Sequence, residues 1–244
     1  MVLFLASVLV ATPVSTSAFP TELSSELQGV LERYQSATKK QHEAMSGVQL
    51  DMEIDGRFTK LREHGQMNVV GAISKADGEM SFDKMVFTGD NRVKTQLIAR
   101  YLEQEQKAKY GAMNITAVDY EFKVGAILKQ DTRTTYIFEV NPRKKSGDKF
   151  RGELWVDGAT GMPLREAGEF AKKPDLLLTK PRFSRDYELH DGISVISRFQ
   201  TSTDVYIPGV GTAVLDVIFR NYSRNTAEQN QREQRLYAKN VLSH

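Results

Sequence analysis

The chain has 244 residues, of which 40% are hydrophobic and 26% charged, so it is long enough to bury the core of one domain without disulfides or metals. Its 33 basic and 31 acidic side chains leave a net charge of +2, which argues against a dedicated nucleic-acid binder. The absence of cysteine excludes thiol catalysis, disulfides, thiolate metal sites and the acylated cysteine of a bacterial lipoprotein.

The first residues have the pattern of a secretory signal peptide. Residues 3–11, LFLASVLVA, form an uncharged apolar run, and Thr16 and Ala18 put small residues three and one positions before a cleavage site. The run is shorter than the roughly 20 residues of a transmembrane helix. We therefore predict that residues 1–18 are a signal peptide cleaved near Ala18. No lysine or arginine precedes the run, so two alternatives stay open: a true start upstream of Met1, or a buried element of the mature fold.

Export without cysteine favours a bacterial envelope, because disulfides are common in eukaryotic secreted proteins. No later segment of the sequence has the length of an apolar transmembrane helix. We predict a periplasmic location, in which the glycosylation sequons at Asn114 and Asn221 are chance matches.

The mature chain begins with a helix and continues with strands. Apolar residues recur at helical spacing over about 21–45, which predicts an amphipathic helix that ends at Gly47. From Val48 the period changes to two, which predicts a half-buried strand. Two further strands near 65–75 and 79–88 are joined by the turn sequence KADGE. The apolar side of the first strand consists of Val48, Leu50, Met52 and Ile54.

A second helix is predicted over 90–110, where helical spacing returns and Asp90 or Asn91 can cap the first turn. Glycine- and aspartate-rich turns then separate seven strands. We place these strands near residues 120–129, 132–140, 150–156, 163–170, 180–189, 193–206 and 212–222.

No linker rich in serine or proline divides the chain, so we predict a single domain over residues 19–225. Residues 226–244 are too polar to build a core and are predicted to form a C-terminal tail or a terminal surface helix. The order of elements favours an α+β fold, in which helices cover one side of a single antiparallel sheet. Ten strands can curl, so we expect a strongly curved sheet or incomplete barrel with the helices over its concave side.

The sequence carries no recognisable catalytic or cofactor motif. The four histidines form no HxH or HExxH pair, and no GxSxG, GxxxxGK or GxGxxG loop is present. We therefore predict no metal, no cofactor and no enzymatic activity. The histidines are His42, His64, His190 and His244.

Three carboxylates, Asp51, Glu53 and Asp55, alternate with the apolar residues of the first strand and share its other side. Such a row can hold a metal or perform acid/base chemistry. A solvated strand face explains it equally well, and the alternation is what a half-buried strand needs in any case. We favour the solvated face.

The stretch RGELWVDGATGMPLREAGEF, residues 151–170, reads as a hairpin that contains the only tryptophan. Both sides of its strands carry large apolar as well as polar residues, and the same holds for TTYIFEV at 134–140. This mixture is typical of a sheet with one face under helices and the other in a partly wet cavity. The candidate residues for binding the ligand, or for the layer that supports its cavity, are Tyr136, Phe138, Trp155 and Phe170, and ordinary core packing explains each of them equally well.

A basic turn, NPRKKSGDKF at residues 141–150, holds Arg143, Lys144 and Lys145 at a strand end. A solvated turn explains it, and so does contact with anionic lipid headgroups or an acidic partner. In the second case each basic residue would contribute about 1 kcal/mol near a charged surface.

The run YIFEVNPRKKSGDKFRGELWVDGATGMPLREAGEF, followed by SRDYELHDGISVISRF, resembles the bacterial outer-membrane lipoprotein-sorting family, which includes the periplasmic carrier LolA and the receptor LolB. The resemblance covers roughly residues 130–205. It implies an incomplete barrel closed by helices over an apolar cavity that shields acyl chains. No individual carrier residue of the family can be matched here, and an apolar protruding loop of the receptor type is not evident.

Two functions follow from these patterns. The first is a periplasmic carrier or binding protein for lipoproteins or other acylated ligands, which acts by burying acyl chains. The second is a non-enzymatic scaffold or interaction module of the cell envelope with the same fold, a filled interior and no lipid ligand. A partner protein or the membrane surface would then contact the basic turn, and neither function involves nucleic acid.

Overall fold

The computed structural model describes residues 25–108, 115–144, 146, 149–171, 181–205 and 209–224. The predicted signal peptide, the predicted C-terminal tail and Lys145 lie outside the described residues.

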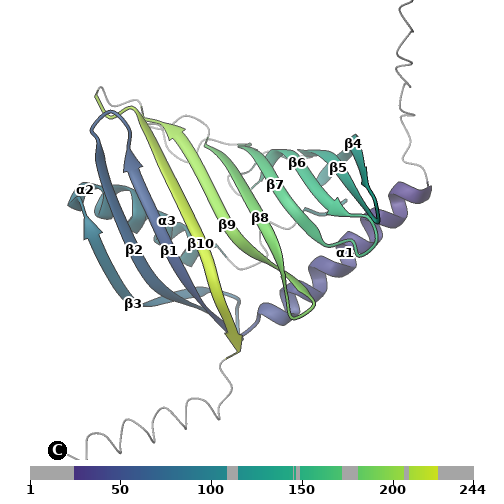
Figure 1. Ribbon diagram of the computed structural model, residues 1–244, viewed down its shortest axis with the longest axis horizontal. Helices are drawn as coiled ribbons and strands as arrows, with labels where there is room; N and C mark the ends of the chain where they lie inside the picture. Colours follow the sequence, from purple (N-terminus) through teal and green to yellow (C-terminus); the bar gives the residue numbers. More distant parts are fainter. Residues whose placement is uncertain are drawn as a thin grey trace, which may run out of the picture.

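In the described part of the chain, ten strands form one antiparallel sheet in the order β3-β2-β1-β10-β9-β8-β7-β6-β5-β4 (Figure 1). The edge strands β3 and β4 are not paired with each other, so the sheet is an open, incomplete barrel. The strands are β1 (Val48–Phe58), β2 (Glu63–Ile73), β3 (Met80–Gly89), β4 (Tyr120–Gln130), β5 (Arg133–Pro142), β6 (Phe150–Asp157), β7 (Pro163–Phe170), β8 (Arg182–His190), β9 (Ile193–Asp204) and β10 (Thr212–Arg224).

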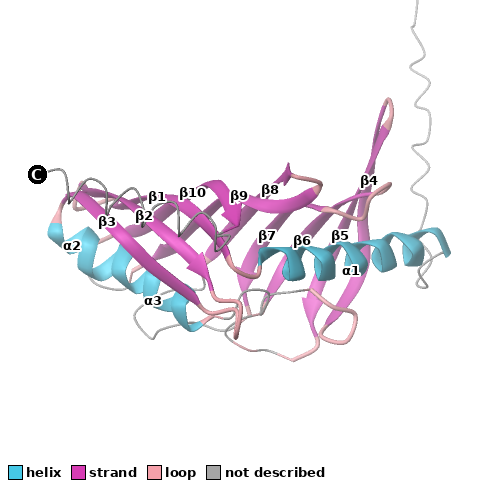
Figure 2. Cartoon of the chain, turned by 90° about the horizontal axis from the view of Figure 1, so that it is seen from below, coloured by secondary structure: helices cyan, strands magenta, loops and turns pink. Residues whose placement is uncertain are grey.

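Two helical segments cover one face of this sheet (Figure 2). The first is α1 (Ser25–Met45). The second runs without a break through α2 (Asn91–Val93), the π-helical turn η1 (Lys94–Ile98) and α3 (Ala99–Lys107). Helix α1 runs beneath the sheet from β5 to β9, and α3 lies beneath the β1–β3 part. The predicted α+β fold, a curved antiparallel sheet with helices over its concave side, is confirmed.

The alternation in β1 explains how the sheet acquires a buried and a wet face. Exposure alternates along this strand. At the even-numbered positions the side chains are at most 5% exposed, and these are Val48, Leu50, Met52 and Ile54. At the odd-numbered positions they are more exposed, and these are Gln49, Asp51, Glu53 and Asp55. Because successive side chains point to opposite faces of a strand, the apolar row faces the helices and the acidic row faces outward.

Two glycines let the second helical segment approach the sheet. Gly56 of β1 and Gly65 of β2 are paired across the two strands. A Cβ atom on Gly56 would lie 3.0 Å from a methyl group of Val93, and one on Gly65 would lie 3.2 Å from the same methyl group. The missing side chains therefore make room for the start of the helix, whose Val93 and Ile98 are fully buried.

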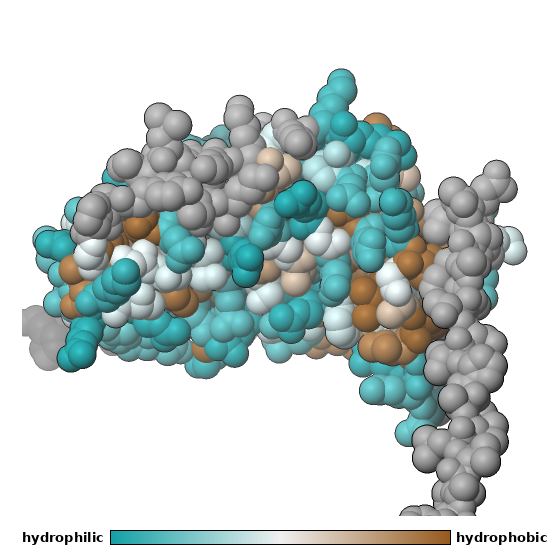
Figure 3. Space-filling view, turned by 90° about the horizontal axis from the view of Figure 1, so that it is seen from above, coloured by the Kyte–Doolittle hydropathy of each residue, from teal (hydrophilic) through white to brown (hydrophobic). Residues whose placement is uncertain are grey.

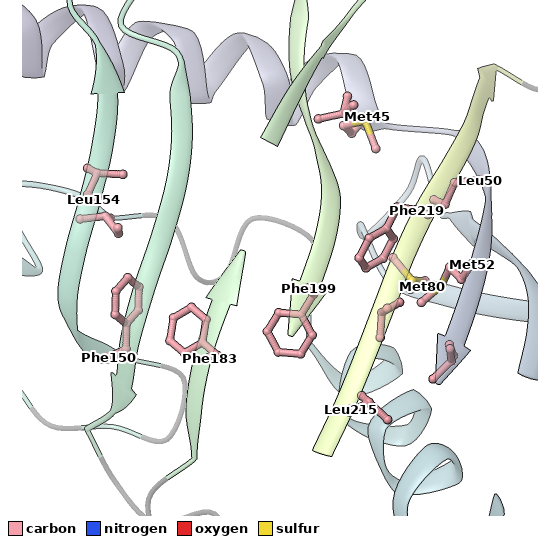
Figure 4. Close-up of a cluster of buried hydrophobic side chains, with 14 of the residues drawn as sticks. Met45, Leu50, Met52, Met80, Phe150, Leu154, Phe183, Phe199, Leu215 and Phe219 are labelled. Atoms are coloured by element: carbon pink, nitrogen blue, oxygen red, sulfur yellow. The ribbon is translucent and has the colours of Figure 1, made fainter. Parts of the chain in front are cut away.

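The buried core has two parts with a bridge between them (Figure 4). Phe150, Leu154 and Phe183 lie on one side, and a methionine-rich group lies on the other, with Phe199 of β9 between them. The methionine-rich group includes Met45, Leu50, Met52, Met80, Leu215 and Phe219.

Candidate functional site

A small cavity of about 50 Å³ lies on the concave face where the end of α1 comes near α3. Its walls are mostly apolar: the apolar side chains come from α1, β1, β2, β3, β9 and β10, and α3 and β8 add polar ones. The apolar lining consists of Met45, Leu50, Ile73, Met80, Ile196, Phe199 and Phe219, and the polar groups come from Tyr101, Glu105, Arg185 and Tyr222.

The polar end of the cavity is organised around Arg185 on β8. Its Nη1 atom lies 2.9 Å from Oε2 of Glu166 on β7, and the two side chains are only 12% and 5% exposed. The guanidinium also faces the rings of Phe183 and Phe199, with Cζ 6.0 and 5.8 Å from their centroids. A buried charge needs a partner of opposite sign, and this ion pair on neighbouring strands supplies it.

Helix α3 contributes Tyr101 and Glu105 to the same end of the cavity. The Tyr101 ring stacks on Phe199, with centroids 5.9 Å apart and an interplanar angle of 14°. Residues four apart lie on the same side of a helix, so this stacking also directs Glu105 toward the sheet. Burial raises the pKa of the Glu105 carboxyl, and the charge of Arg185 opposes that rise.

Burial likewise raises the pKa of Glu166, again against the opposing effect of Arg185. The pKa of Tyr101 rises because of burial and the nearby Glu105. The carboxylates of Glu105 and Glu166 therefore both interact with the single guanidinium of Arg185, and burial limits the access of water to them. The described residues of this arrangement can bind a ligand noncovalently through apolar walls and polar groups.

Three of the four predicted ligand-binding residues lie on the concave face but outside the cavity. Tyr136 and Phe138 are 5% and 0% exposed and belong to the core under α1. The Tyr136 hydroxyl donates a hydrogen bond of 2.5 Å to Glu26 on α1. Phe170 is partly buried against Phe183, at a centroid distance of 4.9 Å. These residues support the concave face and do not line its cavity.

Trp155 lies on the other face of the sheet. Its neighbours Leu154 and Val156 are fully buried on the concave side, so the alternation of β6 turns the indole outward. The indole nitrogen donates a hydrogen bond of 2.9 Å to Glu153, which is exposed. The hairpin residue that the sequence singled out therefore does not border the concave cavity.

The basic turn is partly neutralised by its neighbours. Arg143 lies 3.2 Å from the carboxylate of Glu121 on β4, and its Nε donates to the carbonyl of Ala117. Lys144 is exposed. Of this turn, Lys144 is thus the residue whose described surroundings are most open to an outside partner.

The three carboxylates of β1 line or adjoin a groove of about 310 Å³ on the convex face. Asp51 accepts a hydrogen bond from Asn221, Glu53 accepts one from Gln66, and Asp55 lies 2.6 Å from a ring nitrogen of His64. These contacts agree with a solvated polar strand face. Among the described residues, no group of three or more histidine or acidic side chains is arranged to hold a metal.

Sequence reasoning missed Glu166, Arg185 and Glu105, although the first two carried a signal. Glu166 occupies the row of β7 that also contains Gly168 and Phe170, and Arg185 occupies the row of β8 that contains Phe183. Opposite charges in the inward rows of two strands indicate a buried ion pair. Glu105 carried no such signal, because its position depends on how α3 packs on the sheet.

The surface seen in Figure 3 is mainly hydrophilic, with hydrophobic residues gathered toward opposite ends of the molecule. The edge strands at these ends expose large apolar side chains, Met85 and Val86 on β3 and Ile127 and Leu128 on β4. None of the helices in the described ranges is long and apolar enough to span a membrane.

No family model matches the chain, and no curated protein matches its sequence. Among solved structures, it is similar to a LolA superfamily protein from Nitrosomonas europaea at 12% identity and a TM-score of 0.43, over 83% of this chain and 95% of that chain. It is also similar to an outer membrane lipoprotein-sorting protein domain from Vibrio parahaemolyticus at 16% identity and a TM-score of 0.46, over 89% and 99% of the two chains. A chain of the MucA/MucB complex from Pseudomonas aeruginosa matches at 12% identity and a TM-score of 0.26, over 80% and 96%. The resemblance found in the sequence and the first two of these likenesses name the same family, and the likenesses concern the fold alone.

Proposed function

We propose that this protein is a non-enzymatic carrier or binding protein of the bacterial periplasm that buries acyl chains of lipoproteins or other acylated ligands. The observation that carries the proposal is the concave cavity, whose apolar walls come from six elements that meet between the ends of two helices. Each methylene group moved from water into such a place contributes about 0.8 kcal/mol to binding.

The cavity has to widen before it can hold a chain. Its volume of about 50 Å³ is well below the roughly 300–1,000 Å³ of typical ligand pockets. Met45 and Met80 form part of its wall, and methionine side chains adapt readily because they are unbranched and flexible. An acyl chain would therefore enter as these side chains rearrange and the ends of α1 and α3 separate.

The small volume also supports a second candidate, an interaction module of the cell envelope with a filled interior and no lipid ligand. Its partner would bind the outside of the domain, for example at the basic turn around Lys144. In both cases residues 1–18 would direct export and be removed, and residues 19–225 would act as a single domain.

Native mass spectrometry of the mature protein purified from the envelope, with extraction of any bound lipid, tests the proposal. A stoichiometric acylated species supports the carrier function. A protein that carries no lipid and takes up no added lipopeptide overturns it in favour of the interaction module.

Two matched variants locate the binding site. Ile196→Phe fills the cavity, whereas Ile218→Phe makes the same change in the convex groove of the neighbouring strand β10. We expect the first variant to lose lipid uptake and the second to keep it. Equal uptake by both variants would place the lipid outside the concave cavity.

A further inference from the structure

Among the described residues, the charged groups at and next to the polar end of the concave cavity are one guanidinium and two carboxylates. Arg185 faces two carboxylates, Glu166 at 2.9 Å on the sheet and Glu105 on α3. Both glutamates act on Arg185 electrostatically and favour its charged form. One guanidinium thus balances one of the two carboxylates when both are ionised.

Arg185 is already committed to contacts inside the protein. It pairs with Glu166 and packs between the rings of Phe183 and Phe199. An incoming anion would have to draw the guanidinium away from Glu166 and leave that carboxylate buried without its partner. Removing one partner of a buried pair is strongly unfavourable, so Arg185 is poorly placed to recruit an anionic group.

Glu105 is the acidic group that α3 presents at the cavity. Its side chain is half-buried, whereas Glu103 on the same helix is exposed. Tyr101 fixes this side of α3 against the sheet by stacking on Phe199. A carboxylate held in this way accepts hydrogen bonds and repels other anions.

We propose that the cavity selects acyl chains whose polar end is an uncharged hydrogen-bond donor, such as an amide or an alcohol, and discriminates against chains that end in a carboxylate or phosphate. The inference rests on the proposed function, because it concerns the same cavity. An uncharged donor can bond to Glu105 without the desolvation that a charged ammonium group would require. An anionic end would add a third negative charge beside a single guanidinium.

The test compares dodecanamide with dodecanoate, two ligands with the same alkyl chain and different polar ends. Binding to the mature protein is measured by isothermal titration calorimetry at about pH 7, where free carboxylates are ionised. We expect dodecanamide to bind at least about tenfold more tightly than dodecanoate, as for an unfavourable like-charge contact.

The variant Glu105→Gln should tighten dodecanoate binding, because it removes the like charge, and should weaken dodecanamide binding slightly, because a neutral amide is a weaker acceptor than a carboxylate. Both changes reduce the ratio, which we expect to fall to about twofold or less. The matched control is Glu103→Gln, which removes the same charge from the exposed side of α3 and should leave the ratio as it is. Thermal unfolding of both variants verifies that they are folded.

The outcomes separate the two proposals. If neither ligand binds, the carrier function itself fails. If both bind with equal affinity, or dodecanoate binds more tightly, acyl binding stands and the selection by polar end is overturned. If the ratio is unchanged in Glu105→Gln, the selection does not come from Glu105.

Discussion

Helix α1 and helix α3 are attached to their halves of the sheet by different kinds of contact. Under α1, polar contacts tie the helix to the sheet: Arg33 donates two hydrogen bonds to the carbonyl of Gly158, and Glu26 accepts one from Tyr136. Under the second helical segment the contact is apolar: Val93 of α2 approaches two glycines closely, and Tyr101 of α3 stacks on Phe199. The cavity and its charged groups lie where these two halves meet.

The difference shows that the concave face is not uniformly available to a ligand. The α1 half is filled by aromatic side chains such as Phe138 and Phe150, which are completely buried. The α3 half carries the flexible side chain of Met80 at the cavity, where Met45 at the end of α1 meets it. If the domain opens to bind a ligand, the packed α1 half would keep the sheet in place, and side chains of the α3 half would rearrange.

The largest effect is expected at the junction of the halves. Arg185→Ala would leave the buried Glu166 without its cationic partner and with the hydrogen bond from Tyr187 alone, so we expect the free energy of unfolding to fall by about 3–5 kcal/mol. Urea unfolding near neutral pH measures this change. The paired replacement Arg185→Met with Glu166→Leu removes both charges and should cost less than the single change.

The control for this prediction is an exposed pair on the outer face. Arg198 forms an ion pair with Asp216, and the two side chains are 46% and 24% exposed. Arg198→Ala should cost less than about 1 kcal/mol because solvent screens the pair. If the two alanine variants lose similar amounts, Arg185 is not a buried structural charge.

A change from a small to a large side chain sharpens the comparison between the two halves. Val156 is completely buried beside Tyr136 in the α1 half, so Val156→Phe should overpack the core and cost about 1–3 kcal/mol. Ile196→Phe places its extra atoms in the cavity and should change the free energy of unfolding by less than about 1 kcal/mol. Chemical denaturation of both variants measures the contrast, and equal losses would mean that the α3 half is packed as tightly as the α1 half.

The pH dependence of stability should show the excess of carboxylates at the junction. Burial raises the pKa of Glu105 above its unfolded value of about 4.3, so the folded state favours the protonated form. The stabilisation that this provides is present at low pH and is lost as the pH rises through the folded pKa. Glu105→Gln should therefore be more stable than the wild type near neutral pH, and this gain should disappear as the pH falls to about 4.

Thermal unfolding of both proteins across this pH range gives the difference. Arg185 and Tyr101 lie near Glu105 in both proteins, so their own titration largely cancels in the comparison. Asp216 on the outer face should behave in the opposite sense, because its hydrogen bond with Arg198 lowers its pKa. Asp216→Asn should lose stability near neutral pH and match the wild type at the lowest pH. A gain from Glu105→Gln that grows as the pH falls would contradict the sign argued here.

Most of the fold could be predicted from the sequence because its signals are local. The period-two pattern of β1, with Leu50 and Met52 buried and Asp51 exposed, is complete within a few residues. The turn between β2 and β3 is equally local, since Gly78 supplies the positive φ that the chain needs there.

The candidate site could be predicted only in part. Alternation separates Trp155 from Leu154, but it does not reveal which of the two faces the helices cover, and the tryptophan lies on the uncovered one. The meeting of Glu105 with Arg185 depends on where α3 lies over the sheet, which no local pattern encodes. The inward charges at positions 166 and 185 were the one local sign of the polar end of the cavity.

The smallest effect is expected at the basic turn beyond the α1 half. If the turn contacts anionic headgroups, Lys144→Ala should weaken binding to phosphatidylglycerol vesicles by about 1 kcal/mol, or roughly fivefold, because one basic residue near a charged surface contributes that much. Arg143→Ala should weaken it less, since Glu121 already offsets the charge of Arg143 at 3.2 Å. Vesicle co-sedimentation at low salt measures both, and Lys129→Ala at the opposite end of β4 is the matched control. Equal losses for Lys144 and Lys129 would mean that the vesicles respond to the overall charge of the protein, and the turn would then be an ordinary solvated loop.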